Sequence, residues 1–439
     1  MQLDTSIIVN KKIMNLEISM KAGFSQIDIT PPPGTKKGGW MEDLEARVFL
    51  DPLFARAAVF ETEKERIAFL QLDLLSIRRD DVDDIRRRIE TQFAFPGKNI
   101  MVSATHNHAG PAICRLAPVE KQTEYLELMK EKCVRLFGDA LDAVQEAEIG
   151  QACVKEFDVA FNRRTVMRDG TVKSQTVYSN PDALYQEGPA DPEAAVMIVR
   201  NLKGQPLGAM FNFACHPTHH GGTNEISAGF PGVLAAKVKA SGIPVCLYLN
   251  GAYGNVITVD FQHRISFSKE TVGEKLFEDF QKASGEMCFA RDIELGATAK
   301  IIDLPYRDVS DDEYHGRVRG AQRFRSDELY EKDIDHLKAK IARSKTAKAE
   351  IQVLKLGQWY FAGVPAEYFV EFQLRIKTET YPKSSFVIGG ANGMLGYVPI
   401  QEAFMRGGYE TTLGPPSRMA PETGDIIART AINLIKEMN

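Results

Sequence analysis

Three features that define common protein classes are missing from this sequence of 439 residues. It contains no run of about 18 apolar residues, the length that a membrane-spanning helix needs. The formal net charge is −5 and no basic stripe is present, whereas nucleic-acid binders usually carry a basic excess. Residues 1–20 lack the continuous apolar stretch and the A-x-A-like end of a signal peptide. We therefore expect a cytoplasmic protein with no stable membrane anchor and no nucleic-acid partner, in which residues 1–20 form an N-terminal tail.

Cysteine is sparse and scattered. The six cysteines lie at least 19 residues apart and form no C-x-x-C pair, which excludes a zinc ribbon or a thioredoxin motif. Scattered thiols fit a reducing compartment, and we expect most of them to be buried and inert. The six residues are Cys114, Cys133, Cys153, Cys215, Cys246 and Cys288.

Short apolar segments alternate with amphipathic ones along the chain. Residues 125–144 give the clearest helix, because apolar side chains recur there at steps of three and four residues. The pattern also predicts helices over 81–93, 269–283, 327–342 and 424–437, and strands over 67–72, 100–102, 209–213, 245–249, 358–362 and 386–388. This alternation predicts an α/β or α+β fold with mixed β-sheets flanked by helices. The charged segment 306–348 is expected to form an exposed helical insertion.

Five of the eight histidines fall in two polar turns that follow predicted strands. His106 and His108 form an H-x-H pair, and His216, His219 and His220 follow the strand at 209–213. The carboxyl ends of strands in open α/β sheets meet at one edge, which commonly holds the site. Imidazole is a good zinc ligand. Either cluster alone is also compatible with structural histidines, but two clusters on similar turns indicate a metal site.

Two further signals are weaker. A catalytic zinc usually takes three protein ligands, so a carboxylate is needed besides the histidines. Glu367 follows an apolar strand at 359–361, although spacing alone does not distinguish it from the other acidic residues, 59 in all. Asn250 and Asn255 follow the strand at 245–249, where their amides either line a polar pocket or form the turn.

A series of short phrases follows the order found in a known family. They are Asp28-Ile29-Thr30-Pro31, Ser103-Ala104-Thr105-His106-Asn107-His108-Ala109-Gly110-Pro111, Phe161-Asn162-Arg163, Ala214-Cys215-His216-Pro217-Thr218, Asn250-Gly251-Ala252, residues 363–377 and Ala391-Asn392-Gly393-Met394-Leu395-Gly396-Tyr397. On these residues the chain resembles the catalytic domain of the neutral/alkaline non-lysosomal ceramidase family, from about Met20 to the end. The resemblance implies a single ceramidase-like catalytic domain over residues 21–439.

The resemblance also implies a set of site residues. One zinc ion per chain would be held by His106, His216, Glu367 and Tyr397. Three catalytic residues are implied besides, namely His108, Arg163 and Tyr409. Zinc would polarise a carbonyl and lower the pKa of water to about 7. His108 would transfer a proton, and Arg163 and Tyr409 would stabilise an oxyanion. Tyr397 either ligates the metal weakly or donates a hydrogen bond.

The sequence departs from the family pattern at several points. Ile257 stands where ceramidases have a serine, with Thr258 on the opposite face of an extended chain. Gly229 stands where an aspartate is expected, and the sequence leaves no room for the extra β-sandwich domain of ceramidases. These departures favour a substrate other than ceramide. The resemblance assigns no role to His219 and His220, which are either loop histidines or contacts to a polar substrate.

Three hypotheses follow. The first is a zinc-dependent hydrolase, an amidase or an esterase or lactonase, that cleaves an amide or ester bond in a small polar substrate. The second is a zinc-dependent lyase or isomerase that acts on a sugar-like substrate. The third is a ligand-binding protein that has lost turnover. The sequence leaves the oligomeric state open.

Overall fold

The computed structural model describes residues 20–175, 180–414 and 416–438. The strands of the larger sheet are β1 (Lys21–Asp28), β3 (Phe54–Glu61), β4 (Arg66–Leu72), β5 (Ile100–Ala104), β6 (Gln145–Lys155), β11 (Glu193–Asn201), β12 (Pro206–Phe213), β14 (Cys246–Asn250) and β18 (Phe289–Ala290). A smaller sheet contains β19 (Leu295–Pro305), β20 (Thr346–Leu356), β21 (Trp359–Val364) and β23 (Ser384–Gly389). The remaining strands are β2 (Val48–Phe49), β7 (Phe161–Asn162), β8 (Arg164–Met167), β9 (Val172–Ser174), β10 (Ala183–Gln186), β13 (Glu225–Ile226), β15 (Val256–Ile257), β16 (Val259–Asp260), β17 (Ile265–Ser266), β22 (Glu367–Tyr368) and β24 (Tyr397–Val398). The helices are α1 (Arg79–Phe93), α2 (Thr123–Asp142), α3 (Gly229–Ala240), α4 (Lys269–Gly285), α5 (Asp311–Tyr314), α6 (Asp327–Arg343), α7 (Val370–Thr380), α8 (Gln401–Arg406) and α9 (Thr423–Glu437), with 3-10 helices η1 (Gly97–Asn99) and η2 (Tyr409–Thr411).

Both sheets are mixed. The larger one has the order β14-β12-β11-β6-β1-β3-β4-β5, with β18 paired to β6, and the smaller one has the order β19-β20-β21-β23. The pairs β4/β5, β12/β14 and β21/β23 are parallel, whereas the other neighbouring strands of both sheets are antiparallel. The predicted α/β fold with mixed sheets flanked by helices is confirmed.

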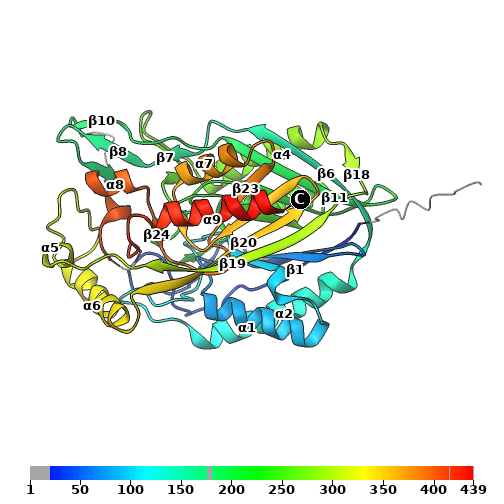
Figure 1. The fold of residues 1–439 in the computed structure, drawn as a ribbon, viewed down its shortest axis with the longest axis horizontal. Helices are drawn as coiled ribbons and strands as arrows, with labels where there is room; N and C mark the ends of the chain where they lie inside the picture. Colours follow the sequence, from blue (N-terminus) through cyan, green and yellow to red (C-terminus); the bar gives the residue numbers. More distant parts are fainter. Residues whose placement is uncertain (1–19, 176–179, 415, 439) are drawn as a thin grey trace, which may run out of the picture.

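The two sheets stack face to face, and helices cover their outer faces (Figure 1). Phe60 and Phe69 belong to the core between the sheets, where Phe69 meets Phe361 edge to face with ring centroids 5.3 Å apart. On its other face the larger sheet packs against α1 and α2 along one half and against α3 and α4 along the other. Helices α7 and α9 cover the outer face of the smaller sheet. Alternate side chains of each strand therefore enter different cores, as the pleat requires.

The charged segment 306–348 largely interrupts a β-hairpin. Strands β19 and β20 pair antiparallel as far as Pro305 and Thr346, and the intervening residues form α5, α6 and their connections. Contrary to what its charge suggests, the segment is not exposed throughout. Tyr330, Ile334 and Leu337 are buried and join the core beneath α7 and α9.

Other expectations are met in part. The predicted tail lies outside the described residues except for Met20, which is buried between the sheets. None of the six cysteines is in a disulfide. Cys133, Cys215 and Cys246 are buried, but Cys153 and Cys288 are exposed, so the expectation of mostly buried thiols is wrong for these two. No helix in the described parts of the chain is long and apolar enough to cross a membrane.

The two edge strands of the larger sheet, β5 and β14, come together because the sheet curls. The Asn250 side chain at the end of β14 bridges them. Its Nδ2 donates to the backbone oxygens of Thr105 at 3.0 Å and Cys215 at 2.9 Å, and its Oδ1 accepts from the Cys215 N–H at 3.1 Å. Thr105 precedes His106 and Cys215 precedes His216, so one amide fixes the spacing of the two histidine-bearing turns.

Replacing Asn250 with Ala should lower the free energy of unfolding by about 3 kcal/mol, because three buried backbone groups lose their partner. Urea denaturation measures this loss, and elemental analysis should show that the variant also holds less zinc. Asn99→Ala is the matched control. Asn99 is buried, donates to Glu65 and Arg66, and lies at the other end of β5. Its loss should destabilise the protein without changing the metal content, and equal zinc in both variants would contradict the role given to Asn250.

Candidate active site

A cavity of about 210 Å³ opens where β5 and β12 end and where β22 begins. All seven site residues implied by the resemblance line it. They are His106, His108, Arg163, His216, Glu367, Tyr397 and Tyr409. The fold therefore brings together side chains from six separate parts of the chain, although their individual roles stay predictions.

Three buried imidazoles form the centre of the cavity. The potential ligand atoms of His106, His108 and His216 all lie within 4.8 Å of one another. The Nδ1 atom of each ring donates to a backbone carbonyl, which leaves a lone pair on each Nε2 atom. The carbonyls belong to Leu75, Gly39 and Tyr253, at 2.7, 3.0 and 3.3 Å respectively.

The protonation of these rings suits a metal ligand. Burial lowers the pKa of His108 and of His216 well below the usual range, so both rings are neutral. Their Nε2 atoms are only 3.1 Å apart. Two lone pairs at this distance repel each other unless a proton or a cation lies near both. His108 is thus placed as a possible third nitrogen ligand as well as a proton carrier.

Glu367 completes the cluster from the smaller sheet's side. Strands β22 and β24 are parallel and place Glu367 directly beside Tyr397. The Glu367 Oε2 atom lies 3.3 Å from the His106 Nε2 and 3.8 Å from the His216 Nε2. The His106 Nε2 is buried without a hydrogen bond to any described residue. A free imidazole nitrogen beside a carboxylate is a donor set that fits zinc.

The backbone and an aromatic ring hold His106 in place. His106 has φ +67°, in the left-handed region that non-glycine residues rarely adopt. Such strain is typical of functional turns, where the surrounding structure offsets its cost. The Tyr253 ring stacks on His106 with centroids 4.5 Å apart and meets His216 edge-on at 5.3 Å. The sequence pointed to the turn that carries Tyr253 but not to this residue.

Arg163 is held by a carboxylate that the sequence analysis missed. Its Nε donates to the Glu410 Oε1 at 2.7 Å, while Arg164 and Ser174 donate to the other oxygen at 2.8 and 2.7 Å. Burial alone would raise the pKa of Glu410, but the two arginines outweigh it and lower this pKa to about 2. The guanidinium lies over the Tyr397 ring at 5.2 Å, and its Nη2 makes no hydrogen bond to a described residue. Arg163 is therefore a positive charge held in a fixed position, and its Nη2 atom remains available to donate a hydrogen bond.

Two further segments of the chain contribute to the wall of the cavity. Trp40 meets His108 edge-on with centroids 5.8 Å apart, and Met41 follows it. Phe324, Arg325 and Tyr330 belong to the segment inserted between β19 and β20. The insertion thus contributes directly to the site.

Several residues singled out in the sequence do not line this cavity. His219 contacts the Phe267 carbonyl through Nε2 at 2.9 Å, and His220 pairs with Glu225 at 2.6 Å. The Asn250 amide is satisfied by backbone, and Asn255 likewise accepts from Val370 N–H and donates to Glu371. Ile257 and Thr258 are buried beside His216 without entering the cavity. Gly229 starts α3 with φ +64°.

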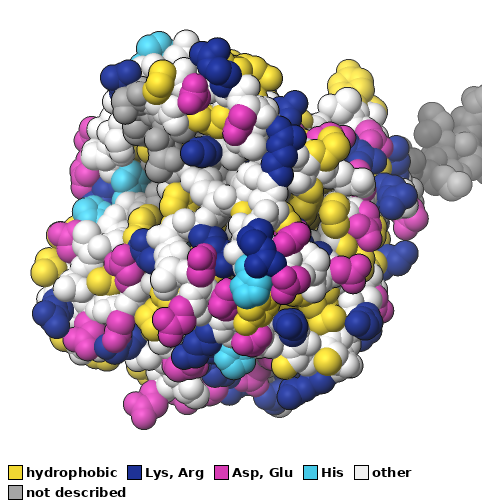
Figure 2. Space-filling model, turned by 90° about the vertical axis from the view of Figure 1, so that its left-hand side faces the viewer, with side chains coloured by type: hydrophobic (Ala, Val, Ile, Leu, Met, Phe, Trp, Pro, Cys, Tyr) yellow, Lys and Arg dark blue, Asp and Glu magenta, His cyan; other side chains and the backbone are white. Residues whose placement is uncertain are grey.

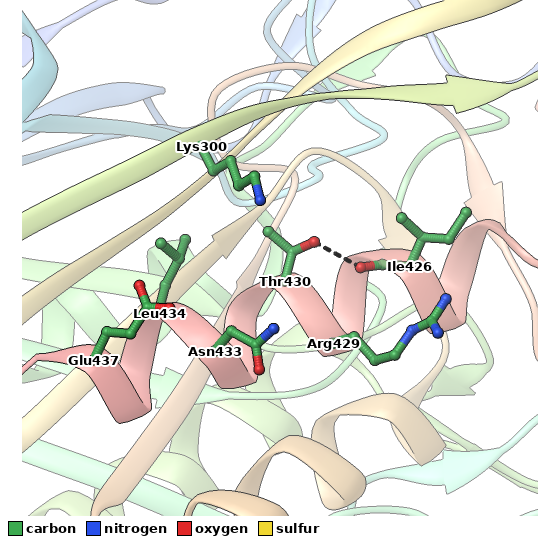
Figure 3. A pocket seen from close by; sticks show the side chains of 7 residues that line it. All are labelled: Lys300, Ile426, Arg429, Thr430, Asn433, Leu434 and Glu437. Carbon is green, nitrogen blue, oxygen red and sulfur yellow. Dashed lines mark hydrogen bonds between the residues drawn. The ribbon is translucent and has the colours of Figure 1, made fainter.

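A groove between β19 and α9 differs from this cavity (Figure 3). Its lining includes Lys300, Arg429, Thr430 and Asn433, and Thr430 Oγ1 donates to its own helix at the Ile426 carbonyl, 2.8 Å away. In Figure 3 Lys300 comes from β19 and the other side chains from α9, and they do not converge on a common point. The groove contains no histidine, so it offers no comparable metal or proton-transfer chemistry.

Comparison with known proteins identifies the family. The model of the family "Neutral/alkaline non-lysosomal ceramidase, N-terminal" matches residues 21–238. The crystal structure of neutral ceramidase from Pseudomonas aeruginosa matches with a TM-score of 0.73 and 19% identity, over 95% of this chain and 74% of that one. A ceramidase complexed with C2 matches with a TM-score of 0.73 and 16% identity, over 95% and 75%. The chain belongs to the neutral/alkaline ceramidase family, as its sequence indicates. Family and fold support a hydrolase, and the three histidines are compatible with a metal ion.

Glu410→Gln should destabilise the protein by about 3 kcal/mol at pH 7, since a carboxylate with pKa of about 2 instead of 4.5 stabilises the folded state by that order. Because the folded-state pKa is lowered, this contribution is complete above about pH 5 and is lost as the pH falls toward 2. Urea unfolding of both proteins between pH 3 and 7 measures the difference. Glu402→Gln, on the exposed side of α8, should match the wild type. A gap between Glu410→Gln and wild type that stays constant down to pH 3 would refute this charge assignment.

Proposed function

We propose that this protein is a zinc-dependent hydrolase of an amide or ester bond in a small polar substrate. One observation carries the proposal, namely three buried imidazoles that point their Nε2 atoms at one another beside the Glu367 carboxylate. Two neutral imidazoles with a nitrogen–nitrogen distance of 3.1 Å favour a cation between them. One zinc ion per chain fits this donor set best, because zinc prefers nitrogen and carboxylate ligands.

The roles of the side chains follow from their positions. His106, His216 and Glu367 would hold zinc, with Tyr397 beside Glu367 as a fourth ligand or a hydrogen-bond donor. Zinc, when bound, supplies a Lewis acid that polarises a carbonyl and acidifies water. His108 would move a proton between water and the leaving group at its Nε2 atom. The spare Arg163 nitrogen and the Tyr409 hydroxyl would donate to the substrate oxygen as it gains negative charge.

The cavity favours a small substrate. Its volume of about 210 Å³ is below the roughly 300–1,000 Å³ of common ligand sites, and Arg163, Gln175 and Arg325 add polar groups to a lining that is otherwise largely apolar. Lys and Arg side chains alternate with Asp and Glu on the end of the molecule that carries α5 and α6, and hydrophobic side chains form only small groups there (Figure 2). A related ceramidase complexed with C2 supports binding of a small molecule in this fold. The cytoplasmic location stays a prediction.

His106→Ala should abolish both zinc binding and hydrolysis, because it removes the ligand nitrogen that lies beside the Glu367 carboxylate. Elemental analysis of untagged protein, together with a screen of acyl esters, amides and lactones, measures both. His220→Ala is the control, since His220 pairs with Glu225 outside the cavity. It should retain about one zinc per chain and full activity. Full zinc and full rate in His106→Ala would disprove the site.

His108→Ala separates the hydrolase from the two alternatives. It should reduce kcat by about 10²–10⁴-fold, the usual contribution of a general acid–base, while retaining the metal. Zinc retained in the wild type without turnover of any ester, amide or lactone would favour a lyase, an isomerase or a binding protein instead.

A further inference from the structure

A second cavity of about 660 Å³ lies on the other side of the histidine cluster. Both cavities are lined by the same five residues, Leu75, His106, Leu116, Glu367 and Pro416. The presumed metal ligands His106 and Glu367 therefore face both cavities. A substrate whose scissile bond lies at this cluster can extend one end into the second cavity.

Helix α1 begins at the wall of this second cavity. Arg78, Arg79 and Asp80 line it, and no side chain caps the first turn of the helix, whose N-cap residue is Arg78. The free N–H groups of a helix N-terminus attract anions. Arg78 is exposed, and its guanidinium makes no hydrogen bond or ion pair with another residue in the described parts of the chain.

Tyr306 and Arg418, from other parts of the chain, also line the second cavity. Tyr306 and Met419 form an isolated β-bridge, which puts Tyr306 beside Arg418. Arg418, whose Nη2 donates to the Met394 carbonyl at 2.9 Å, lines the same cavity as Arg78, so two guanidinium groups contribute to its wall. The Tyr306 side chain is only 7% exposed, and its hydroxyl finds no partner among the described residues. A buried hydroxyl without a partner costs about 1–3 kcal/mol, and a bound acceptor would remove this cost.

The acidic residues of the cavity do not cancel this positive charge. Asp333 is paired with Arg115 and accepts from the Ala117 N–H at 3.3 Å. Glu367 belongs to the histidine cluster, and Asp80 is exposed at the rim. Further basic groups on the wall are His336, Lys340 and Lys348.

We propose that the second cavity binds a carboxylate or phosphate group of the substrate through Arg78, Arg418 and the Tyr306 hydroxyl. This inference rests on the proposed hydrolase function and narrows its substrates to amides or esters that carry an anionic group. The scissile carbonyl lies at the histidine cluster, between the Arg163 cavity and the anion subsite.

Binding is tested first and needs no turnover. Inorganic phosphate and succinate are titrated calorimetrically into the full, zinc-loaded chain. Arg78→Ala and Tyr306→Phe should each raise the Kd about tenfold, the effect of losing one charge-assisted or buried hydrogen bond. Arg87→Ala is the matched control, because Arg87 is an exposed arginine of the same helix that pairs with Asp84 and does not line this cavity. Equal Kd values for wild type and Arg78→Ala, or no binding at all, would overturn the subsite.

Kinetics then links the subsite to the reaction. Two amides of one chromogenic amine are compared, an acetyl and a succinyl derivative. The succinyl amide should have a kcat/KM about tenfold higher than that of the acetyl amide, mainly because its KM is lower. Arg78→Ala should remove this preference. Phosphate should inhibit its hydrolysis competitively. Stimulation of acetyl hydrolysis by phosphate would identify a separate effector and overturn the assignment to the substrate.

The two proposals fail in different ways. Hydrolysis of both amides at equal efficiency, with no anion binding, would leave the hydrolase standing and remove the anion subsite. Anion binding that depends on Arg78, with neither amide nor the matching esters hydrolysed, would remove the hydrolase and the substrate assignment that rests on it.

Discussion

The Asn250 amide is the contact on which the geometry of the site depends. Strands β5 and β14 are the outermost strands of one sheet, so nothing in the ladder of hydrogen bonds brings their ends together. Asn250 does so by joining the residues before His106 and His216 through backbone groups alone. Buried backbone groups outside the cavity therefore hold the two histidine-bearing turns in place. The imidazole nitrogens that face the cavity remain available to a ligand.

Two kinds of polar group are kept apart within the cavity. Burial makes the His108 and His216 rings neutral, and the Nδ1 atoms of all three histidines are bonded to backbone carbonyls, so the Nε2 atoms face inward. Arg163 keeps its charge because Glu410 is buried with it and bonds its far side. The cavity thus presents lone pairs on one wall and a cationic donor on the other. A polarised carbonyl group matches both walls, with its oxygen toward Arg163.

The sequence predicted those helices and strands whose apolar residues recur at a regular spacing, because such an element buries only one side. Helix α2 repeats apolar residues along one side, whereas α3 carries Pro231 in its first turn and buries several sides, so its pattern is weak. The two histidine-bearing turns, expected at one edge of the sheet, do bring His106, His108 and His216 together. Glu367, Arg163 and Tyr397 came only from the resemblance, because nothing local distinguishes them. Glu410, Tyr253 and Tyr306 were missed, since their contacts lie far away in sequence.

The hairpin that carries the insertion has an evolutionary consequence. Because Pro305 and Thr346 are paired neighbours, the segment between them leaves and rejoins the sheet at nearly the same point. Its length and sequence can change through mutation or recombination without disturbing the ladder that supports the ligands. Phe324, Arg325 and Tyr330 from this segment nevertheless touch the cavity. Changes in this segment would therefore alter the wall of the cavity, and with it substrate selectivity, without moving the residues expected to bind the metal.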